Sequence, residues 1–364
     1  MISGTVDARF ALVKDAFADN VTRRGEQGAA LCVRIDGRTV VDLWAGAGWR
    51  PDSLVNVFSV GKGLIAIVLA RLVGRGLIEP PAPVARYWPE FAAADKDATT
   101  VAQLFSHQAG LPALRRPLPP GAMFDHDFMA RALATEQPWW EPGTGHGYHV
   151  NTYGFLAGEL VRRATGTTLG AIVRDEIGGG DIFIGVPASQ SHRVIDFHWP
   201  GTASAPEVAV EPDMTYNTYF NPPGISGDGT VNTAAWRSAE LPSANTHASA
   251  RGIAAVYDAL LAGRLATAHA LAAVTAEQVN GNDLVLGRPS RFGLGFQLPQ
   301  PDRPLGPNPE AFGHFGAGGS LGFADPASGV GFGYVMNTMG GTGWQSSRNR
   351  ALIDALYTSL DGPA

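Results

Sequence analysis

The sequence predicts a mixed α/β fold: an antiparallel sheet built from both termini and flanked by helices, with a mostly helical insertion domain. Two observations lead to this fold class. Strand-like runs lie near both ends of the chain, and the middle is rich in short helical pieces and loops. At 364 residues the chain is too long for one small core. We therefore expect an α/β domain from residues 1–79 and 236–364, and a mostly helical, loop-rich domain from residues 80–235.

The N-terminal elements of the α/β domain are a helix and a hairpin. Residues 7–22 carry apolar side chains at helical spacing, which predicts a helix packed on the surface. Two β-rich runs, residues 29–35 and 38–45, flank an Asp-Gly dipeptide that is typical of a tight hairpin turn. The single cysteine, Cys32, falls in the first run, so we expect a buried strand residue rather than a reactive thiol.

The middle and C-terminal segments complete the expected fold. A helix that is apolar on every side should follow Ser59 and end near Gly74 and Gly76. A second helix is expected over residues 151–164, and residues 185–232, dense in Pro, Gly, Ser and Asn, predict ordered loops. The remaining predictions are strands at residues 291–298, 319–324 and 330–337 and a final helix at residues 352–360.

Composition excludes several classes of function. The net charge of −6 argues against general binding to nucleic acid or to an anionic membrane. One cysteine rules out a disulfide within the chain and cysteine-rich metal sites. No metal-ligand spacing, phosphate-binding loop or dinucleotide fingerprint occurs, so we expect no metal and no cofactor. The N-terminus has no secretory pattern, and the longest apolar stretch is too short to span a bilayer, so a cytoplasmic location is expected.

The first sign of chemistry is a serine followed three residues later by a lysine. On a helix, this spacing places Ser59 and Lys62 on one face. Ser59 would stand at the helix start, where free N–H groups favour a developing oxyanion, and burial would lower the pKa of Lys62 so that it can act as a base. A Ser-x-x-Lys match is a weak signal alone, but the chain has only three lysines, Lys14, Lys62 and Lys96. A lysine on a buried helix is costly unless it has a task; the alternative is a lysine that extends to the surface.

Four ordered motifs share a family resemblance. They are Val57-Phe-Ser-Val-Gly-Lys62, Leu104-Phe-Ser-His-Gln-Ala-Gly-Leu-Pro112, Glu141-Pro-Gly-Thr-Gly-His-Gly-Tyr148, and the Gly-rich run from Phe312 to Pro326. Together they resemble the serine β-lactamase and penicillin-binding-protein superfamily, and within it the class C β-lactamase-like branch that includes the family VIII carboxylesterases. The resemblance runs from about residue 10 to the C-terminus. It implies a β-lactamase/transpeptidase-like fold with the active site between the two domains.

The resemblance assigns a second base to Tyr148. The family's Tyr-x-Asn motif falls on Tyr148-His149-Val150, and it implies that Tyr148 takes the serine proton and passes it to the leaving group. Lys62 can supply the nearby cation that a phenol needs for deprotonation. Tyr153 is the competing tyrosine, but it falls within a helical pattern and is expected to pack. Val150 departs from the motif, and Asn151, one position late, is expected to cap the next helix.

The third motif, Lys-Thr-Gly or His-x-Gly in the family, falls on His314-Phe315-Gly316, on a strand that lines the site. Gly316 would let the substrate approach the strand closely. The resemblance implies that the backbone N–H groups of Ala317 and Ser59 form the oxyanion hole, and that His314 orients Tyr148 or contacts the leaving group. The alternative is that His314 is a structural histidine at a sheet edge, with its hydrogen bonds satisfied.

A second serine motif competes with Ser59. Gly318-Gly-Ser320-Leu-Gly322 matches the Gly-x-Ser-x-Gly nucleophile elbow. That motif needs a helix after the serine, whereas Phe-Ala-Asp-Pro follows here and argues against one. We therefore expect Ser320 to belong to a Gly-rich strand and to have no catalytic role.

The expected function is hydrolysis of a small carboxylic ester through an acyl-enzyme on Ser59. Esters are favoured over lactams by Val150, by His314 and by apolar or aromatic residues near the motifs. The expected pocket residues are His149, Val150, Phe124 and Phe315, with Trp139 and Trp140 as further candidates. The alternatives are a β-lactamase, a D-amino peptidase or amidase, or an acyltransferase of the same fold, because pocket shape separates these activities. A non-catalytic binding homologue is a more remote alternative.

Overall fold

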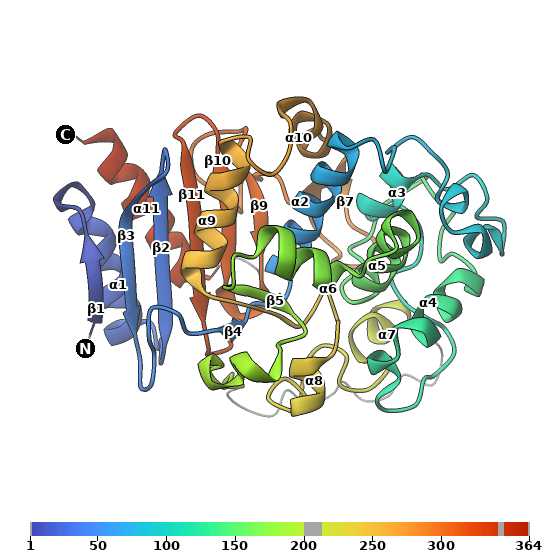
Figure 1. Ribbon diagram of the computed structural model, residues 1–364, viewed down its shortest axis with the longest axis horizontal. Helices are drawn as coiled ribbons and strands as arrows, with labels where there is room; N and C mark the ends of the chain where they lie inside the picture. Colours follow the sequence, from blue (N-terminus) through green and yellow to red (C-terminus); the bar gives the residue numbers. More distant parts are fainter. Residues whose placement is uncertain (1, 200–212, 341–345, 363–364) are drawn as a thin grey trace.

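The computed structural model describes residues 2–199, 213–340 and 346–362. Its main feature is a six-stranded antiparallel sheet in the order β1-β3-β2-β11-β10-β9 (Figure 1). The first three strands come from the N-terminus and the last three from the C-terminus, so the predicted sheet built from both termini is confirmed. The strands are β1 (Ile2–Val6), β2 (Ala29–Ile35), β3 (Arg38–Ala45), β9 (Phe312–Phe315), β10 (Leu321–Asp325) and β11 (Val330–Met336).

The predicted hairpin is formed by β2 and β3. Its two turn residues, Asp36 and Gly37, have φ angles of 47° and 83°, the positive values that a two-residue hairpin turn of this kind requires. Cys32 lies opposite Gly333 in the centre of the sheet and is buried, as expected. Burial raises the pKa of its thiol to about 12, so the thiol stays protonated at neutral pH.

Helices cover both faces of this sheet. On one face lies α9 (Ala250–Leu261), which crosses β2, β10 and β11 (Figure 1). Gly333 allows close contact, because a Cβ there would fall 2.4 Å from the backbone oxygen of Ala250. On the other face, α1 (Ala11–Arg23) packs against α11 (Ser347–Asp361). Both terminal helices were expected, and α11 begins five residues earlier than predicted.

The helix that follows Ser59 is α2 (Val60–Gly74), and it is buried on nearly every side, as predicted. It packs against α10 (Ala268–Thr275) and the sheet strands β9 and β10. Its last residue is Gly74, and Gly76 follows with a φ of 67°. The nucleophile candidate therefore lies at the start of a helix in the centre of the molecule.

The middle of the chain is helical and lies at the opposite end from β1 (Figure 1). A small sheet in the order β4-β6-β5 joins the two regions. Its strands are β4 (Val55–Asn56), β5 (Ile182–Ile184) and β6 (Thr246–Ala248); the helices are α3 (Val101–Phe105), α4 (His126–Thr135), α5 (Thr152–Thr165), α6 (Leu169–Ile172), α7 (Met214–Phe220) and α8 (Ala234–Ser238). The predicted helix at residues 151–164 is confirmed as α5, and Gly166 ends it with a φ of 73°.

Two segments differ from the prediction. The stretch 185–232 was expected to be loops, but α7 lies within it; residues 200–212 are outside the described part. The Thr, Asn and aromatic residues of α7 are poor helix formers. The helix depends on the Asp213 side chain, which accepts hydrogen bonds from two backbone N–H groups of the first turn. The strand expected over 291–298 is shorter: β8 (Pro289–Phe292) pairs with β7 (Val279–Asn282), and beyond Gly293 and Gly295 a single bridge joins Gln297 back to Phe292.

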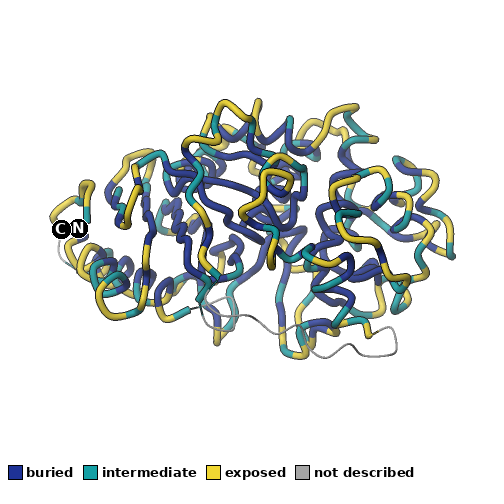
Figure 2. The backbone as a smooth tube through the Cα atoms, turned by 90° about the horizontal axis from the view of Figure 1, so that it is seen from below, coloured by how far each residue is buried: buried dark blue, intermediate teal, exposed yellow. Residues whose placement is uncertain are grey.

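Buried residues run continuously through the centre of the molecule (Figure 2). One large hydrophobic cluster contains residues of both expected domains, and a small one contains Leu54, Phe183 and Val186. The division at residues 79/80 and 235/236 stays a prediction. None of the helices in the described ranges combines the length and hydropathy needed to cross a membrane.

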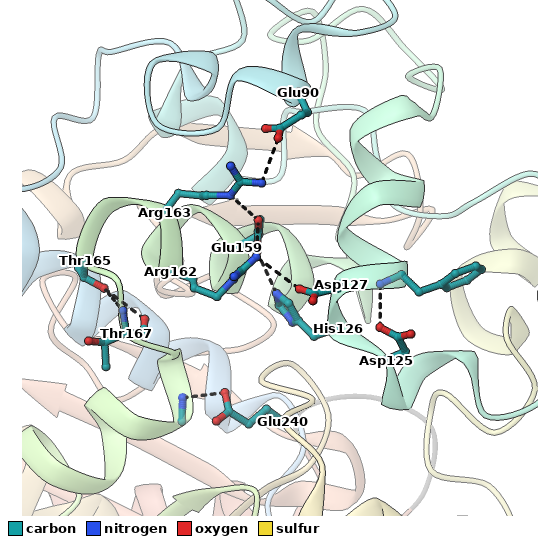
Figure 3. A network of polar contacts seen from close by, with 12 residues as sticks. Glu90, Asp125, His126, Asp127, Glu159, Arg162, Arg163, Thr165, Thr167 and Glu240 are labelled. Atoms are coloured by element: carbon teal, nitrogen blue, oxygen red, sulfur yellow. Dashed lines mark hydrogen bonds and ion pairs between the residues drawn. The ribbon is translucent and has the colours of Figure 1, made fainter.

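A polar network holds α5 against α4 and against the short 3-10 helix Pro89–Ala92, which carries Glu90 (Figure 3). At its centre, the nearly fully buried Glu159 accepts from Nε of Arg162 at 2.8 Å and from Nε of Arg163 at 2.7 Å, while His126 lies 3.4 Å away. Burial raises the pKa of Glu159, but these hydrogen-bonding partners outweigh it and hold the pKa well below its usual value. The carboxylate is therefore charged and paired.

Candidate active site

Ser59 occupies the N-terminal end of α2, with 8% of its surface exposed. Although it stands at the N-cap position, its side chain makes no capping hydrogen bond. Its Oγ instead lies 3.0 Å from Nζ of Lys62, one turn into the helix. The hydroxyl is thus paired with a base and lies among the free N–H groups of the helix start.

The residue before Ser59 has a strained backbone. Phe58 has a φ of 48°, in the left-handed region that bulky side chains rarely adopt. Its ring packs edge-to-face on Phe197 at 5.0 Å between centroids and on Trp199 at 6.2 Å. This aromatic packing helps to hold the turn that presents Ser59.

Lys62 is completely buried, and burial lowers its pKa well below the usual value. Besides Ser59, its Nζ contacts the backbone oxygens of Val150 at 2.6 Å and of Ser243 at 3.3 Å. A neutral amine has two N–H groups, which these two carbonyls can accept. In this neutral form the lone pair of Nζ is left to accept from the Ser59 hydroxyl 3.0 Å away, the arrangement that proton removal requires.

Tyr148 lies beside this pair. Its ring centroid is 4.8 Å from Nζ of Lys62, and the ring stacks on Phe292 and on His314. Burial raises the pKa of Tyr148 well above the usual value, and a hydrogen bond with Ser59 opposes that rise. The structure therefore brings the three predicted catalytic side chains together at the start of α2.

The end of β9 approaches the other side of Ser59. A Cβ on Gly316 would fall 2.3 Å from the backbone oxygen of Val57, so only glycine fits this close contact. Ala317, the next residue, lines the same cavity as Ser59, in keeping with an oxyanion hole between their N–H groups. His314 is completely buried and bonds through Nδ1 to the Phe315 backbone oxygen at 2.7 Å; burial lowers its pKa well below the usual value, so the ring is neutral.

A cavity of about 260 Å³ opens beside Ser59. Its walls are mostly apolar and aromatic, which suits an uncharged organic substrate. Among the described residues around it, Asp228, in an exposed loop, carries the one full charge. The lining residues are Phe58, Ser59, Val150, Asn151, Trp199, Tyr219, Phe220, Ser226, Asp228, Ser243, Ala244, Ala317 and Met339.

Comparison with known proteins decides the family. The Beta-lactamase family model matches residues 13–357, almost the whole chain. The chain belongs to the β-lactamase family. Its sequence is 34% identical to Esterase/beta-lactamase LipL of Mycobacterium tuberculosis, over 93% of this chain and 83% of that protein.

Solved structures of this β-lactamase family agree closely in fold. A crystal structure of a family VIII carboxylesterase superposes with a TM-score of 0.92 at 40% identity, covering 99% of this chain and all of that one. A penicillin-binding protein homologue from Caulobacter crescentus has a TM-score of 0.90 at 39% identity, with coverage of 99% and 100%. The predicted family and fold are confirmed.

Within this β-lactamase-family site, Asn151 does not have the expected capping role. Its side chain makes no capping hydrogen bond to α5. Its Nδ2 instead donates to the backbone oxygen of Thr218 at 2.9 Å and to Oγ of Ser226 at 3.0 Å. Asn151 thereby connects the Tyr148 loop to α7, which carries Tyr219 and Phe220 of the cavity lining.

Three of the expected pocket residues lie away from the cavity lining. Phe124 is exposed and lines a different cavity beside His126. His149 is buried, and both its ring nitrogens bond to backbone groups, of Leu111 and Gly147. Phe315 is buried in the hydrophobic core. Of the expected set, Val150 alone lines the cavity; the further candidates Trp139 and Trp140 each bond to a nearby backbone oxygen, outside its lining.

The aromatic wall formed by Trp199, Tyr219 and Phe220 was missed, because the stretch 185–232 was interpreted as loops. An aromatic cluster in a segment otherwise rich in Gly, Pro and Asn was the signal that could have found it. A buried carboxylate, Asp283, was missed as well; it accepts from the backbone N–H of Tyr148 at 3.0 Å.

The competing serine lies outside the cavity lining. Ser320 is completely buried, and the strand β10 follows it rather than a helix. The nucleophile-elbow interpretation therefore lacks its structural context, as expected. Within residues 2–199, 213–340 and 346–362, His, Cys, Asp and Glu side chains form no group placed to hold a metal ion.

Proposed function

We propose that this protein hydrolyses small carboxylic esters through an acyl-enzyme on Ser59. The observation that carries the proposal is the 3.0 Å contact between Ser59 Oγ and a buried Lys62 whose pKa is lowered, with Tyr148 beside both. The names of two relatives, an esterase/β-lactamase and a family VIII carboxylesterase, support the ester class.

The reaction has two steps. Ser59 Oγ attacks the ester carbonyl carbon, and its proton passes to the Tyr148–Lys62 pair. The tetrahedral oxyanion is held by the N–H groups of Ser59 and Ala317 until the C–O bond to the alcohol breaks and the pair returns the proton to the alkoxide. Water then attacks the acyl-enzyme by the same proton route, which releases the carboxylic acid and restores Ser59.

The cavity favours esters over β-lactams. Val150 presents a side chain without hydrogen-bonding groups, His314 is neutral, and the cavity wall is aromatic. Lactam hydrolysis is the second candidate, because one relative's name includes β-lactamase and one solved neighbour is a penicillin-binding protein homologue. Amidase and acyltransferase activities remain alternatives of the same site, and a cytoplasmic location stays a prediction.

Parallel turnover of nitrocefin and of p-nitrophenyl acetate and butyrate tests the proposal. We expect kcat/KM for the esters to exceed that for the lactam. Faster lactam turnover would contradict the ester assignment, and no turnover of any of the three would support the non-catalytic alternative.

A further inference from the structure

Tyr148 is held by a carboxylate that lies outside the segments that match the Ser-x-x-Lys, Tyr-x-Asn and His-x-Gly motifs. Asp283 follows β7 directly and is completely buried. Its Oδ1 and Oδ2 lie 3.0 and 3.1 Å from the backbone nitrogen of Tyr148, so the N–H is shared between them. The same carboxylate accepts from the N–H groups of Val285 and Leu286, each at 2.9 Å, and from the Ser290 hydroxyl at 2.8 Å.

These contacts connect two segments that are far apart in the sequence. Val285 and Leu286 belong to the turn between β7 and β8, and Asp283 closes that turn in the manner of an Asx turn. A second bond, from Leu284 N–H to the His146 oxygen at 3.0 Å, runs beside the contact with Tyr148. The loop that carries Tyr148 is therefore fixed to a tight turn, where a small displacement would move the phenol away from Ser59.

We infer that Asp283 is a positioning residue for the reaction: its buried carboxylate accepts the backbone N–H of Tyr148 and holds the phenol in place beside Ser59 and Lys62. This inference rests on the proposed function. Asp283 does not touch the cavity beside Ser59, so it acts through Tyr148.

The negative charge of Asp283 affects the pKa of Tyr148 in a known direction. Burial is the main cause of the raised pKa of Tyr148, and the charge of Asp283 raises that pKa further. Because an anion favours the protonated form of any group near it, Asp283 should make the Tyr148–Lys62 pair a stronger base. Removal of the charge should therefore lower the pH at which the pair loses its proton.

The histidines and the other tyrosines around Tyr148 are uncharged at neutral pH. Burial lowers the pKa of His107 and His314 well below the usual value and that of His149 to about 4, and burial keeps Tyr153 and Tyr219 protonated. His146, whose pKa is also lowered by burial, bonds to Ser290 on the far side of Asp283. Two arginines lie on this side of Asp283: the charge of Arg288 lowers the pKa of Tyr219, and the buried Arg303 interacts electrostatically with Asp283. Among the groups that raise the pKa of Tyr148, Asp283 is therefore the one that carries a charge at neutral pH, and its effect adds to the larger effect of burial.

The experiment compares Asp283→Asn with a matched control, Asp325→Asn. Asparagine nearly preserves the shape at Asp283 and removes the charge. Asp325 is an equally buried carboxylate that closes a turn in the same way, accepting from the N–H groups of Ala327 and Ser328 and from the Tyr357 hydroxyl, but it lies outside the cavity lining. The readouts are kcat, KM and the pH dependence of kcat/KM for p-nitrophenyl butyrate, with thermal unfolding of each variant.

For Asp283→Asn we expect kcat to fall 10- to 100-fold, KM to change less than about threefold, and the acid limb of kcat/KM to move to lower pH by about one unit. Asp325→Asn should leave kcat and the acid limb within error of the wild type even where it lowers the unfolding temperature. If the wild type is active and Asp283→Asn has the same kcat and the same acid limb, the positioning role is overturned and the proposed function is not affected.

Two further outcomes are informative. If Asp283→Asn does not fold, Asp283→Ser keeps a hydroxyl that can close the turn, and it should show the same shift of the acid limb; a failure of this variant to fold as well would make Asp283 a folding residue and overturn the inference. A wild type that neither hydrolyses esters nor reacts with a serine-directed phosphonate would overturn the proposed function, and the positioning role with it.

Discussion

Nζ of Lys62 lies 2.6 Å from the backbone oxygen of Val150, closer than its 3.0 Å distance to Oγ of Ser59. The lysine side chain therefore connects α2 to the main chain of the Tyr148 loop. Because only the backbone of residue 150 is needed for this contact, its side chain is free to line the cavity, as Val150 does.

Replacement of the buried lysine by arginine should abolish activity. Lys62→Arg introduces a guanidinium that stays protonated and cannot accept the serine proton, so we expect kcat/KM to fall more than about 100-fold. Lys96→Arg is the matched control: Lys96 is also buried, but its Nζ donates to three backbone oxygens, of Ala93, Ala134 and Glu136, which is a structural role. Ester hydrolysis at equal folded concentration measures both, and an active Lys62→Arg would contradict the base assignment.

The pH dependence of the wild type follows from the burial of Lys62. Its pKa lies well below the usual value, so the amine is neutral above that lowered pKa and becomes protonated as the pH falls through it. Activity should therefore be present at neutral pH and decline on acidification. A profile of kcat/KM that rises only near the ordinary pKa of lysine, about 10.4, would show that the amine is not perturbed.

Asn151 should affect the pocket wall more than the chemistry. Asn151→Ala removes two hydrogen bonds to the α7 region, which should cost about 1–3 kcal/mol of stability and loosen Tyr219 and Phe220. We expect KM for p-nitrophenyl butyrate to rise several-fold with kcat within about threefold of the wild type. A loss confined to kcat would place Asn151 in the reaction itself.

Glu159 should matter for stability alone. Glu159→Gln leaves Arg162 and Arg163 without their buried anion, so we expect a loss of about 3 kcal/mol in the free energy of unfolding. Because the pKa of this carboxylate is held low, its contribution is present above the unfolded pKa of about 4.3 and is lost as the pH falls towards the lower folded pKa. Urea unfolding at pH 7 and pH 3 measures this, and kcat of the folded variant should match the wild type.

The fold and the contact between Ser59 and Lys62 could be predicted because their signals are local. Ser59 and Lys62 are one helical turn apart, so the helix alone brings them together. The hairpin at Asp36-Gly37 follows from the φ angles that only a few residue types adopt readily. The sheet built from both termini could be predicted because strand-like runs lie at each end of the chain.

The pocket wall and Asp283 could not be predicted in the same way. Tyr219 and Phe220 reach the cavity through α7, which is short, depends on the Asp213 cap, and lies about 160 residues after Ser59 in the chain. The contact of Asp283 with Tyr148 spans 135 residues and depends on a turn that has no motif of its own. Local propensity carries no information about such packing, and for this reason Phe124 and Phe315 were assigned to the pocket from their nearness to motifs.

The nucleophile assignment also predicts a difference between two serines. Ser59→Ala should lower kcat/KM for p-nitrophenyl butyrate by more than about 1,000-fold, because the covalent step is lost. Ser320→Ala should retain a measurable rate, since Ser320 lies outside the cavity lining. The reverse result would transfer the nucleophile to the second motif.

The most direct test of Ser59 as the nucleophile is to incubate the wild-type protein with a serine-reactive phosphonate and measure its intact mass. Peptide mapping then locates the adduct. We expect one adduct, located on the peptide that contains Ser59, and no adduct on Ser59→Ala. An unlabelled protein, or an adduct on another residue such as Ser320, would contradict the claim that Ser59 is the nucleophile.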